Sequence, residues 1–405
     1  MKLAIVILNW NGAEMMRRYL PSVIRHSQME GVEVIVADNA STDNSLEMLA
    51  QEFPDVPTVV LDQNYGFAGG YNKALKQIEA DYFLLLNSDV EIRQPRWVEP
   101  MLAYMDAHTD VAACQPKLLK LFDSSEETVP SSSGGSYSPS FGGFPSPVNG
   151  GRLGSLEEAL NVAPAPTKGC KSPTCNGGRE GGVKTIDRGE AFEYAGAAGG
   201  FLDRYGYPFC RGRVFDTIET DRHQYDELCD LHWATGAALM VRAADFWAVG
   251  GLDEHFFAHM EEIDICWRLR LRGKRIVCIS QSEAYHLGGA TLHQGNPRKT
   301  FLNFRNNLLM LYKNLPEKDL KQVMRRRSLL DWIAALQFLL KLDRQNFLAI
   351  RKAKREFKKL KPAFALKRQE VQQNRVGTTD SDRCAFSLLW QYFFRRRKHF
   401  SQLPV

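Results

Sequence analysis

The tripeptide Asn87-Ser88-Asp89 is the sharpest local indication of chemistry in this sequence of 405 residues. It follows directly after the apolar run YFLLL, where a buried strand is expected to end. A carboxylate at such a strand end can hold a hard divalent cation, Mg²⁺ or Mn²⁺, that bridges a diphosphate. The same tripeptide is also common in turns. By itself it therefore leaves a metal site and a plain turn both open.

Three acidic residues crowd the start of a second segment, FFAHMEEIDICWRLRLRG, in which a helix is expected over residues 263–272. Crowding of Glu261, Glu262 and Asp264 raises the pKa of at least one carboxylate, which suits a general base for a sugar hydroxyl. Acidic residues at a helix start can also simply stabilise the helix dipole. An inverting displacement needs one base and one Lewis acid. Glu262 together with a metal at Asp89 would supply both.

Polar residues also follow the other expected strands of the first 120 residues. Asp38 ends the run VIVAD, where its carboxylate can accept a hydrogen bond from the imide N–H of uracil or thymine. An N-cap or an Asx turn is the alternative role for Asp38. Asn64 precedes Gly66, Gly69 and Gly70, which open a helix whose N-terminal amides could face phosphate or ribose. These glycines do not form GxGxxG, so a dinucleotide cofactor site is disfavoured.

A histidine and several basic residues follow the acidic segment. His286 lies in SEAYHLGGAT, beside glycines that allow close backbone approach. An imidazole next to a diphosphate can bind a metal or act as a charge partner, although a lone histidine is more often structural. Arg298, Lys299 and Arg305 lie in NPRKTFLNFRNN. They can contact phosphate, or they can form the solvated basic start of a helix.

The elements that must position these side chains alternate along the first 120 residues. Apolar runs predict strands over residues 3–8, 34–37, 58–61, 82–86 and 111–115, and helical spacing lies between them over 14–26, 45–53, 68–78 and 97–108. This alternation is typical of an α/β fold with a mostly parallel sheet covered on both faces. Ligands bind at the carboxyl ends of such strands, so the polar clusters should converge there.

Composition divides the chain into four parts. Residues 1–122 form the expected nucleotide-binding half, and residues 123–189 are rich in Ser, Gly and Pro and predict a flexible insertion. Residues 190–300 regain strand and helix patterns and form the expected acceptor-side half. Residues 301–405 are helical in pattern and carry 24 Lys/Arg against 8 Asp/Glu, a net charge of +16 in a chain whose total is +5.

This basic C-terminal region indicates an anionic partner surface. Aromatic and basic residues alternate in the terminal FSLLWQYFFRRRKHF, as in segments that lie at the interface of a membrane. A helical appendage packed on the catalytic domain and a nucleic-acid-binding tail are the alternatives, and nucleic acid is the less favoured partner. No run reaches the ~20 apolar residues of a spanning helix. Scattered cysteines in expected core elements favour a reducing compartment. We therefore expect a cytoplasmic protein, peripheral on the cytoplasmic face of a bacterial membrane.

The order of these motifs resembles family 2 of the inverting glycosyltransferases, which have the GT-A fold, and especially its bacterial rhamnosyltransferase-like branch. The resemblance covers about residues 1–122 and 190–310 and rests on the following motifs: VILNWNG, VADNASTDNS, NYGFAGGYNKAL, LLLNSDV, WATGAALMVR, GGLDEHFF, the EEID helix and YHLGG. It implies that Asp38 contacts the base, Asp89 binds the metal, Glu262 is the usual catalytic base, and His286 is a further metal or diphosphate contact. The nucleotide-binding residues expected in total are Asn9, Asn11, Asp38, Asn64, Gly66, Asn87, Ser88, Asp89 and Arg305.

The resemblance also implies a reaction. A sugar would pass from a UDP- or dTDP-sugar, with dTDP-rhamnose as one candidate, to a hydroxyl of a glycan or lipid-linked acceptor in surface polysaccharide synthesis. Two departures from the family pattern are Asn87 in place of the first Asp of the DxD-type motif and Glu262 where Asp is common. A third is the insertion over 123–189. The competing hypotheses are a sugar-nucleotide nucleotidyltransferase and a non-enzymatic protein that binds membranes or nucleic acid.

Overall fold

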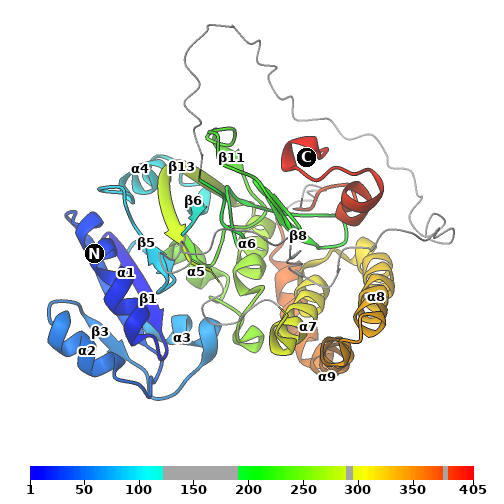
Figure 1. Cartoon of the computed structure of the whole chain (residues 1–405), viewed down its shortest axis with the longest axis horizontal. Coiled ribbons are helices and arrows are strands. Elements are labelled where there is room, and N and C mark those ends of the chain that lie inside the picture. The colour runs from blue at the N-terminus through cyan, green and yellow to red at the C-terminus, as the bar shows by residue number, and fades with distance from the viewer. Residues whose placement is uncertain (122–189, 289–294, 377–381) are drawn as a thin grey trace, which may run out of the picture.

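A mixed nine-stranded sheet forms the centre of the computed structural model, which describes residues 1–121, 190–288, 295–376 and 382–405 (Figure 1). The predicted insertion over 123–189 lies outside these described residues. The strand order is β11-β13-β6-β12-β4-β1-β2-β3, and β5 pairs with β13. The strands are β1 (Leu3–Asn9), β2 (Val32–Asp38), β3 (Thr58–Val60), β4 (Tyr82–Leu86), β5 (Val90–Glu91), β6 (Val111–Lys120), β11 (Cys229–Asp230), β12 (Ala238–Arg242) and β13 (Arg275–His286). The α/β fold with a mostly parallel sheet is confirmed.

Helices cover both faces of this sheet because alternate side chains of its buried strands point to opposite sides. Leu3, Ile5 and Ile7 of β1 pack in one core with α1 (Ala13–His26), α2 (Ser45–Glu52) and α4 (Glu99–Ala107). Ala4 and Val6 pack in the other core with α3 (Gly66–Leu75), α5 (Ala243–Ala248) and α6 (Glu261–Leu271). The apolar runs of the sequence are therefore continuous because both of their faces are buried.

The parallel register aligns the polar ends of the strands. Asn9 of β1 lies opposite Asp38 of β2, and Ile7 of β1 lies opposite Leu86, the last residue of β4. Asn87 therefore comes to the same edge of the sheet as Asn9 and Asp38. This convergence is the one that the sequence pattern predicts.

Strand β13 is longer than the predicted strand over 275–279, and its extension carries His286. Ile279 pairs with Pro116 of β6, and the next paired residue of β13 is Glu283, which lies opposite Lys117. Proline has no N–H to donate to the ladder, so an irregularity at this point is expected. Pairing resumes beyond the bulge and places His286 opposite Lys120 and beside Val90 of β5.

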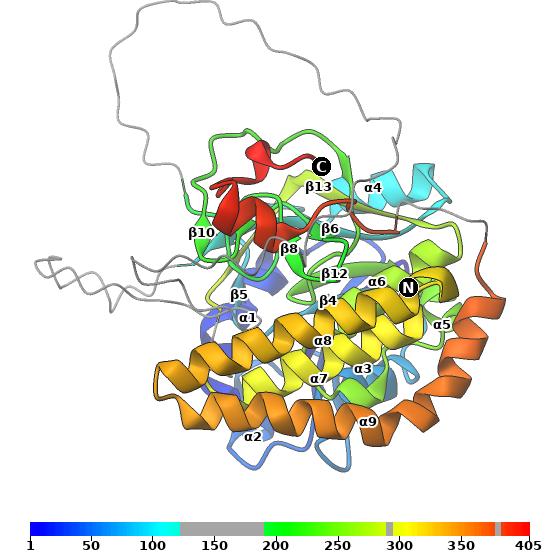
Figure 2. The same ribbon diagram turned by 90° about the vertical axis from the view of Figure 1, so that its right-hand side faces the viewer.

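A small antiparallel sheet packs under the C-terminal end of the chain. Its strands are β7 (Gly200–Leu202), β8 (Pro208–Cys210), β9 (Arg213–Val214) and β10 (Thr217–Ile218). Aromatic rings of the terminal segment stack on it, with ring centroids 5.2 Å apart for Phe400 and Phe201 and 4.9 Å apart for Tyr392 and Phe215. Figures 1 and 2 show this segment, in red, lying over these strands.

Most aromatic residues of the terminal segment FSLLWQYFFRRRKHF, which was expected to lie at a membrane interface, pack against the protein. Phe386, Tyr392, Phe393 and Phe400 pack against the hydrophobic core. Packing already removes part of each of these rings from water, which leaves less apolar surface for lipid. Phe394 is the exposed member of the set.

Three long helices form the C-terminal region: α7 (Pro297–Asn314), α8 (Glu317–Leu340) and α9 (Arg344–Gln373). Figure 2 shows them side by side across one face of the molecule. Buried ion pairs join α7 to the catalytic part, because Lys313 Nζ lies 2.8 Å from Asp264 Oδ2 of α6 and 2.7 Å from Asp253 Oδ2. The alternative of a helical region packed on the catalytic domain is thus the one observed. Among the described residues, no helix is both long and apolar enough to cross a membrane.

Candidate functional site

Asp89 and His286 form a buried pair at the carboxyl end of the sheet. Asp89 Oδ1 lies 3.1 Å from His286 Nε2, and Asn87 Nδ2 lies 3.2 Å from the same imidazole nitrogen. The other nitrogen of His286, Nδ1, lies 3.3 Å from Glu193 Oε1. The backbone fixes the pair as well, because Leu287 N donates to the carbonyl of Asp89. The sheet thus brings together Asp89 and His286, which lie almost 200 residues apart in the sequence.

Charge stabilises this arrangement despite its burial. Burial opposes ionisation of the Asp89 carboxyl, but the adjacent His286 outweighs it and the pKa of Asp89 is lowered. Burial also opposes the charged imidazole, but Asp89 and Glu193 outweigh it, so the pKa of His286 is raised well above its ordinary value. A cation placed between Asp89 and Glu193 is therefore favoured at neutral pH.

The donor atoms of this pair fit a divalent cation. A carboxylate oxygen and an imidazole nitrogen 3.1 Å apart can reach one ion at the usual bond lengths of ~2.0–2.2 Å. Glu193 on the far nitrogen supplies the outer contact that commonly orients a metal-binding histidine. Metal binding would replace the proton on His286. The predicted metal ligands, Asp89 and His286, therefore lie close enough together to contact one cation.

The three acids at the start of α6 have different surroundings. Asp264 is completely buried, and its oxygens accept hydrogen bonds of 2.8 Å from Arg268, Lys313 and Asn314. Glu261 is buried, and its Oε2 has no hydrogen-bond partner within the described part of the chain. Burial and the neighbouring Glu262 raise the pKa of Glu261 well above its ordinary value. Burial raises the pKa of Glu262 to about 7.

Glu262 lies next to the Asn87-Ser88-Asp89 turn through a short backbone bridge. The Cβ and Cγ of Glu262 pack against Gly236, at 3.5 and 3.6 Å from where a Cβ on that glycine would lie. The carbonyl of the next residue, Ala237, accepts a 3.0 Å hydrogen bond from Asn87 N. Two consecutive residues, Gly236 and Ala237, thus link Glu262 to the turn that contains Asp89.

A strained loop leads into α6 at this site. Phe257, His259 and Met260 have positive φ angles of 64°, 70° and 75°, a region that residues other than glycine rarely adopt. Burial lowers the pKa of His259 to about 4, and Lys299 adds to this effect. His259 is therefore neutral at physiological pH and lies near Lys299. Strain of this kind is concentrated at functional sites.

The expected base contact, Asp38, is part of a turn. It has no exposed surface, Oδ2 accepts a 3.0 Å hydrogen bond from Asn9 Nδ2, and Oδ1 accepts one of 2.8 Å from Ser41 N. Asn11 Oδ1 accepts from Thr42 N at 2.7 Å and closes the same loop. Asp38 thus accepts a hydrogen bond from a backbone N–H three residues on, a local contact like that of an N-cap. A direct contact between Asp38 and a base would require this turn to open.

The expectation that the first amides of α3 face phosphate or ribose is wrong in this structure. The carbonyl of Phe257 accepts hydrogen bonds from Phe67 N at 2.7 Å and Ala68 N at 3.3 Å, while Asn64 Oδ1 accepts from Gly66 N at 2.8 Å. The Phe257 ring also lies only 2.5 Å from where a Cβ on Gly66 would be. The glycine therefore makes room for a protein loop, and the amides are already satisfied.

Arg305 is likewise engaged by the protein. Its guanidinium donates 3.0 Å hydrogen bonds to the carbonyls of His255 and Phe256, and its Nε donates to Asn306 Oδ1. These contacts hold the loop that leads into α6. The geometry differs from the predicted nucleotide contact and gives Arg305 a structural role.

Two residues of the site have no counterpart among the sequence predictions. Glu193 comes shortly after residues 123–189, at the start of a glycine-rich stretch without hydrophobic periodicity. No local sequence pattern therefore predicts its contact with His286. Trp10 lies between two of the predicted residues, Asn9 and Asn11, and is 51% exposed although it is large and apolar. An exposed tryptophan between two polar residues at a strand end is the signal that could have identified it.

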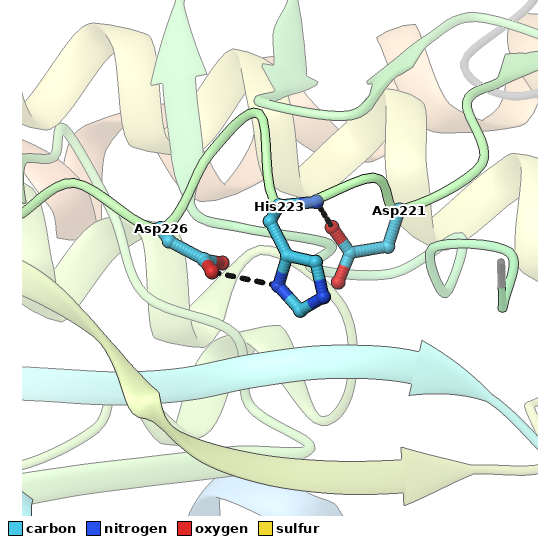
Figure 3. Close-up of side chains that lie close together, drawn as sticks. All are labelled: Asp221, His223 and Asp226. Carbon is cyan, nitrogen blue, oxygen red and sulfur yellow. Dashed lines mark hydrogen bonds and ion pairs between the residues drawn. The ribbon is translucent and has the colours of Figure 1, made fainter. Parts of the chain in front are cut away.

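A second group of possible metal ligands lies elsewhere, at Asp221, His223 and Asp226 (Figure 3). His223 Nδ1 lies 2.8 Å from Asp226 Oδ2, and His223 N donates to Asp221 Oδ1. The buried ammonium of Lys117 already lies 2.7 Å from Asp221 Oδ2 and 2.9 Å from Asp226 Oδ1. The two carboxylates thus have a cation of their own, and we assign this group to the stability of the bulged strand pair.

Comparison with known proteins gives one family match. Residues 4–133 match the sequence model of Glycosyl transferase family 2. The N-acetylglucosaminyl-diphospho-decaprenol L-rhamnosyltransferase of Mycobacterium tuberculosis is 22% identical over 295 residues, which cover 70% of this chain and 75% of that protein. The rhamnosyltransferase WbbL of Escherichia coli is 33% identical over 86 residues, covering 21% of this chain and 31% of that protein. The solved structure of S. aureus TarS 1-349 aligns with a TM-score of 0.45 and 16% identity, over 92% of this chain and 89% of that one.

The match over residues 4–133 includes β1 to β4 and the Asn87-Ser88-Asp89 turn. The longer relative extends the similarity over the acceptor-side half. The predicted glycosyltransferase class is thereby confirmed, and the predicted family is confirmed for the residues that the sequence model matches. The chain is a glycosyltransferase whose residues 4–133 match family 2, and it is similar to rhamnosyltransferases.

Proposed function

We propose that this glycosyltransferase moves a sugar, with inversion, from a UDP- or dTDP-sugar to a hydroxyl of a glycan or lipid-linked acceptor, with Mg²⁺ or Mn²⁺ as cofactor. The observation that carries the proposal is the short link from Glu262, through Gly236 and Ala237, to the turn that contains Asp89. Asp89 in turn contacts His286. One side of that turn offers ligands for a cation. The other offers a carboxylate whose pKa of about 7 matches the requirement for a general base.

The donor would bind over the ends of β1, β2 and β4. The exposed ring of Trp10 provides a face on which a uracil or thymine can stack. Asn9, Asn11, Asp38 and Asn64 act in this proposal by fixing the loops that carry the ring. Asn87 and Ser88 lie beside the diphosphate. A cation held by Asp89 and His286 would neutralise the charge that develops on the departing diphosphate.

The acceptor hydroxyl would approach from the side of α6. Glu262 takes the proton of that hydroxyl. The hydroxyl oxygen then bonds to the anomeric carbon of the donor sugar, and the bond from that carbon to the diphosphate oxygen breaks. His259 Nε2 and Glu261 Oε2 have unused hydrogen-bonding capacity within the described residues. Because buried polar atoms normally have partners, these two atoms are suited to bind other hydroxyls of the acceptor.

The relatives suggest the class of acceptor. The mycobacterial enzyme is named for an acceptor that is a sugar on a diphospho-decaprenol lipid, and the match to WbbL is to another rhamnosyltransferase. We therefore infer that dTDP-rhamnose is the first donor to test and that the acceptor is a lipid-linked precursor of a cell-envelope polysaccharide.

A panel of nucleotide sugars, each assayed with Mg²⁺, Mn²⁺ or excess chelator, tests this function. We expect one UDP- or dTDP-sugar to raise the thermal unfolding temperature and to release nucleoside diphosphate in a metal-dependent reaction. Pyrophosphate release from a nucleoside triphosphate and a sugar phosphate would instead identify a nucleotidyltransferase. Failure of every donor to bind would contradict the proposal.

The substitution Glu193→Gln should weaken metal binding about 10- to 100-fold, since it removes the charge that orients His286. The measurement is the Mn²⁺ concentration that gives half-maximal donor hydrolysis, compared with the rate at saturating Mn²⁺. We expect the half-maximal Mn²⁺ concentration to rise in the variant, and its rate at saturating Mn²⁺ to return to that of the unmodified enzyme. Glu190→Gln, at an exposed neighbouring carboxylate, is the matched control and should change neither. An equal loss of rate at every metal concentration would point to a different role for Glu193.

A further inference from the structure

The outer face of α8 exposes a row of large apolar side chains. We call this row the α8 stripe. It consists of Leu329, Trp332, Leu336 and Leu339, which lie three or four residues apart, and of Leu340, which lies one turn after Leu336. They are between 39% and 74% exposed. The opposite face of the same helix is also apolar and is buried through Val323, Leu330, Ala334 and Phe338. Core packing therefore accounts for one apolar face of α8 and leaves the α8 stripe without a function in the fold.

The stripe continues around the turn that joins α8 to α9. Leu342 in this turn is 84% exposed, and Leu348 in the first turns of α9 is 55% exposed. A contiguous row of this kind is unusual, because isolated exposed leucines are common whereas exposed apolar patches mark binding surfaces.

Basic residues border the stripe along α9. The segment 344–360 contains seven Lys/Arg and one Glu, and its exposed cations include Arg344, Arg351, Lys352, Arg355, Lys358 and Lys359. Lys354 shows that the two helices place these groups side by side. Its Nζ donates a 2.8 Å hydrogen bond to Ser328 Oγ of α8 and lies 5.3 Å from the centre of the Trp332 ring.

The first half of α8 adds to this charge. Lys318, Lys321 and Arg325 are exposed and precede the stripe by whole helical turns on the same face. The combined surface is apolar in the middle and cationic at its borders. A second copy of this chain would bring two positively charged borders together, whereas an anionic lipid surface offers both hydrocarbon for the leucines and opposite charge for the borders.

We propose that the α8 stripe and the cationic face of α9 dock this enzyme on an anionic lipid bilayer. The helix lies along the bilayer surface with Trp332 at headgroup depth and the leucines below it, while the lysines and arginines contact lipid phosphates. The surface lies on α8 and α9 and replaces the terminal segment 386–400 as the membrane contact. The purpose of this docking, access to a lipid-linked acceptor, rests on the proposed function. The docking surface is inferred from exposed side chains alone.

Flotation of the full chain with vesicles tests the proposal. We expect it to float with vesicles that mix phosphatidylcholine and phosphatidylglycerol and not with phosphatidylcholine alone, and to lose binding in high salt. Leu340→Asn should lower binding about tenfold. Leu366→Asn is the matched control, because Leu366 and Leu340 are each 74% exposed and Leu366 lies far along α9 from the stripe.

The charged borders give a second comparison. Arg351→Gln with Lys352→Gln should lower binding roughly fivefold per neutralised cation, whereas Arg395→Gln with Arg396→Gln in the terminal segment should not. The proposal would be overturned if both pairs of charge substitutions lowered vesicle binding equally, or if Leu340→Asn and Leu366→Asn did so. A stable dimer that Leu340→Asn dissociates would also overturn it. Donor hydrolysis in solution should be unchanged in every variant, which separates failure of docking from failure of the proposed function.

Discussion

Asp89→Asn is expected to lower the rate of nucleoside diphosphate release by about 10²–10³-fold, the effect of removing one charged group that acts on the developing charge. The asparagine would keep the size of the side chain and the backbone hydrogen bond from Leu287. It would remove the charge that, with His286, makes the candidate metal site. The measurement is the steady-state rate against metal concentration with the best donor.

Asp62→Asn is a suitable control for this substitution. Asp62 also follows a strand of the sheet, but it is exposed and its carboxylate accepts a hydrogen bond from the Tyr65 hydroxyl. We expect its rate to stay within about twofold of the unmodified enzyme, as for most surface changes. Full activity of Asp89→Asn at ordinary metal concentrations would refute the role given to Asp89.

Glu262→Gln is expected to lower kcat by about 10²–10⁴-fold, the usual contribution of general base catalysis, and to leave the KM for the donor nearly unchanged. The amide fits the same space beside Gly236 but cannot accept the proton of the acceptor hydroxyl. The unmodified enzyme should also gain activity as the pH rises from about 6 to about 8, because the base must be ionised and its pKa is about 7. The variant should lose this pH dependence.

Neighbouring acids provide the controls that decide which residue is the base. Burial and the neighbouring Glu262 raise the pKa of Glu261 well above its ordinary value, which makes Glu261 the weaker candidate for an ionised base, so Glu261→Gln should keep most of kcat. Asp264→Asn should instead lower the free energy of unfolding by about 3 kcal/mol, as when one partner of a buried ion pair is removed. If Glu262→Gln kept the pH dependence and Glu261→Gln lost it, the base would be Glu261 and not Glu262.

The strands and helices of the first 120 residues could be predicted because their patterns are local. The strand over 82–86 is observed with the same bounds, and the other predicted strands there differ at their ends by one to five residues. The extension of β13 to His286 could not be predicted. It depends on pairing with Pro116 and Lys117, which lie far away in the sequence.

The site was predictable to a similar degree. Asp89, His286 and Glu262 were identified from their places after strands or at a helix start, and the sheet brings Asp89 and His286 into contact. The ligand contacts predicted for the start of α3 and for Arg305 differ from the observed ones because the loop between α5 and α6 accepts hydrogen bonds from Phe67, Ala68 and Arg305. The positive φ angles just before α6 fall on Phe257, His259 and Met260, none of which is glycine, so the sequence gives no sign of the shape of the loop there.

The sequence by itself determined the turn Asn87-Ser88-Asp89 as a candidate site, the parallel sheet that carries it and the family to which both belong. These follow from hydrophobic period and from residues placed at strand ends, which are properties of short segments. Only the tertiary structure decided that Glu193 contacts His286, that Asp264 is taken up by Lys313 and Arg268, and that Glu262 is left beside the turn. Such choices depend on which charged groups share one buried space, because each buried charge must find a partner or shift its pKa.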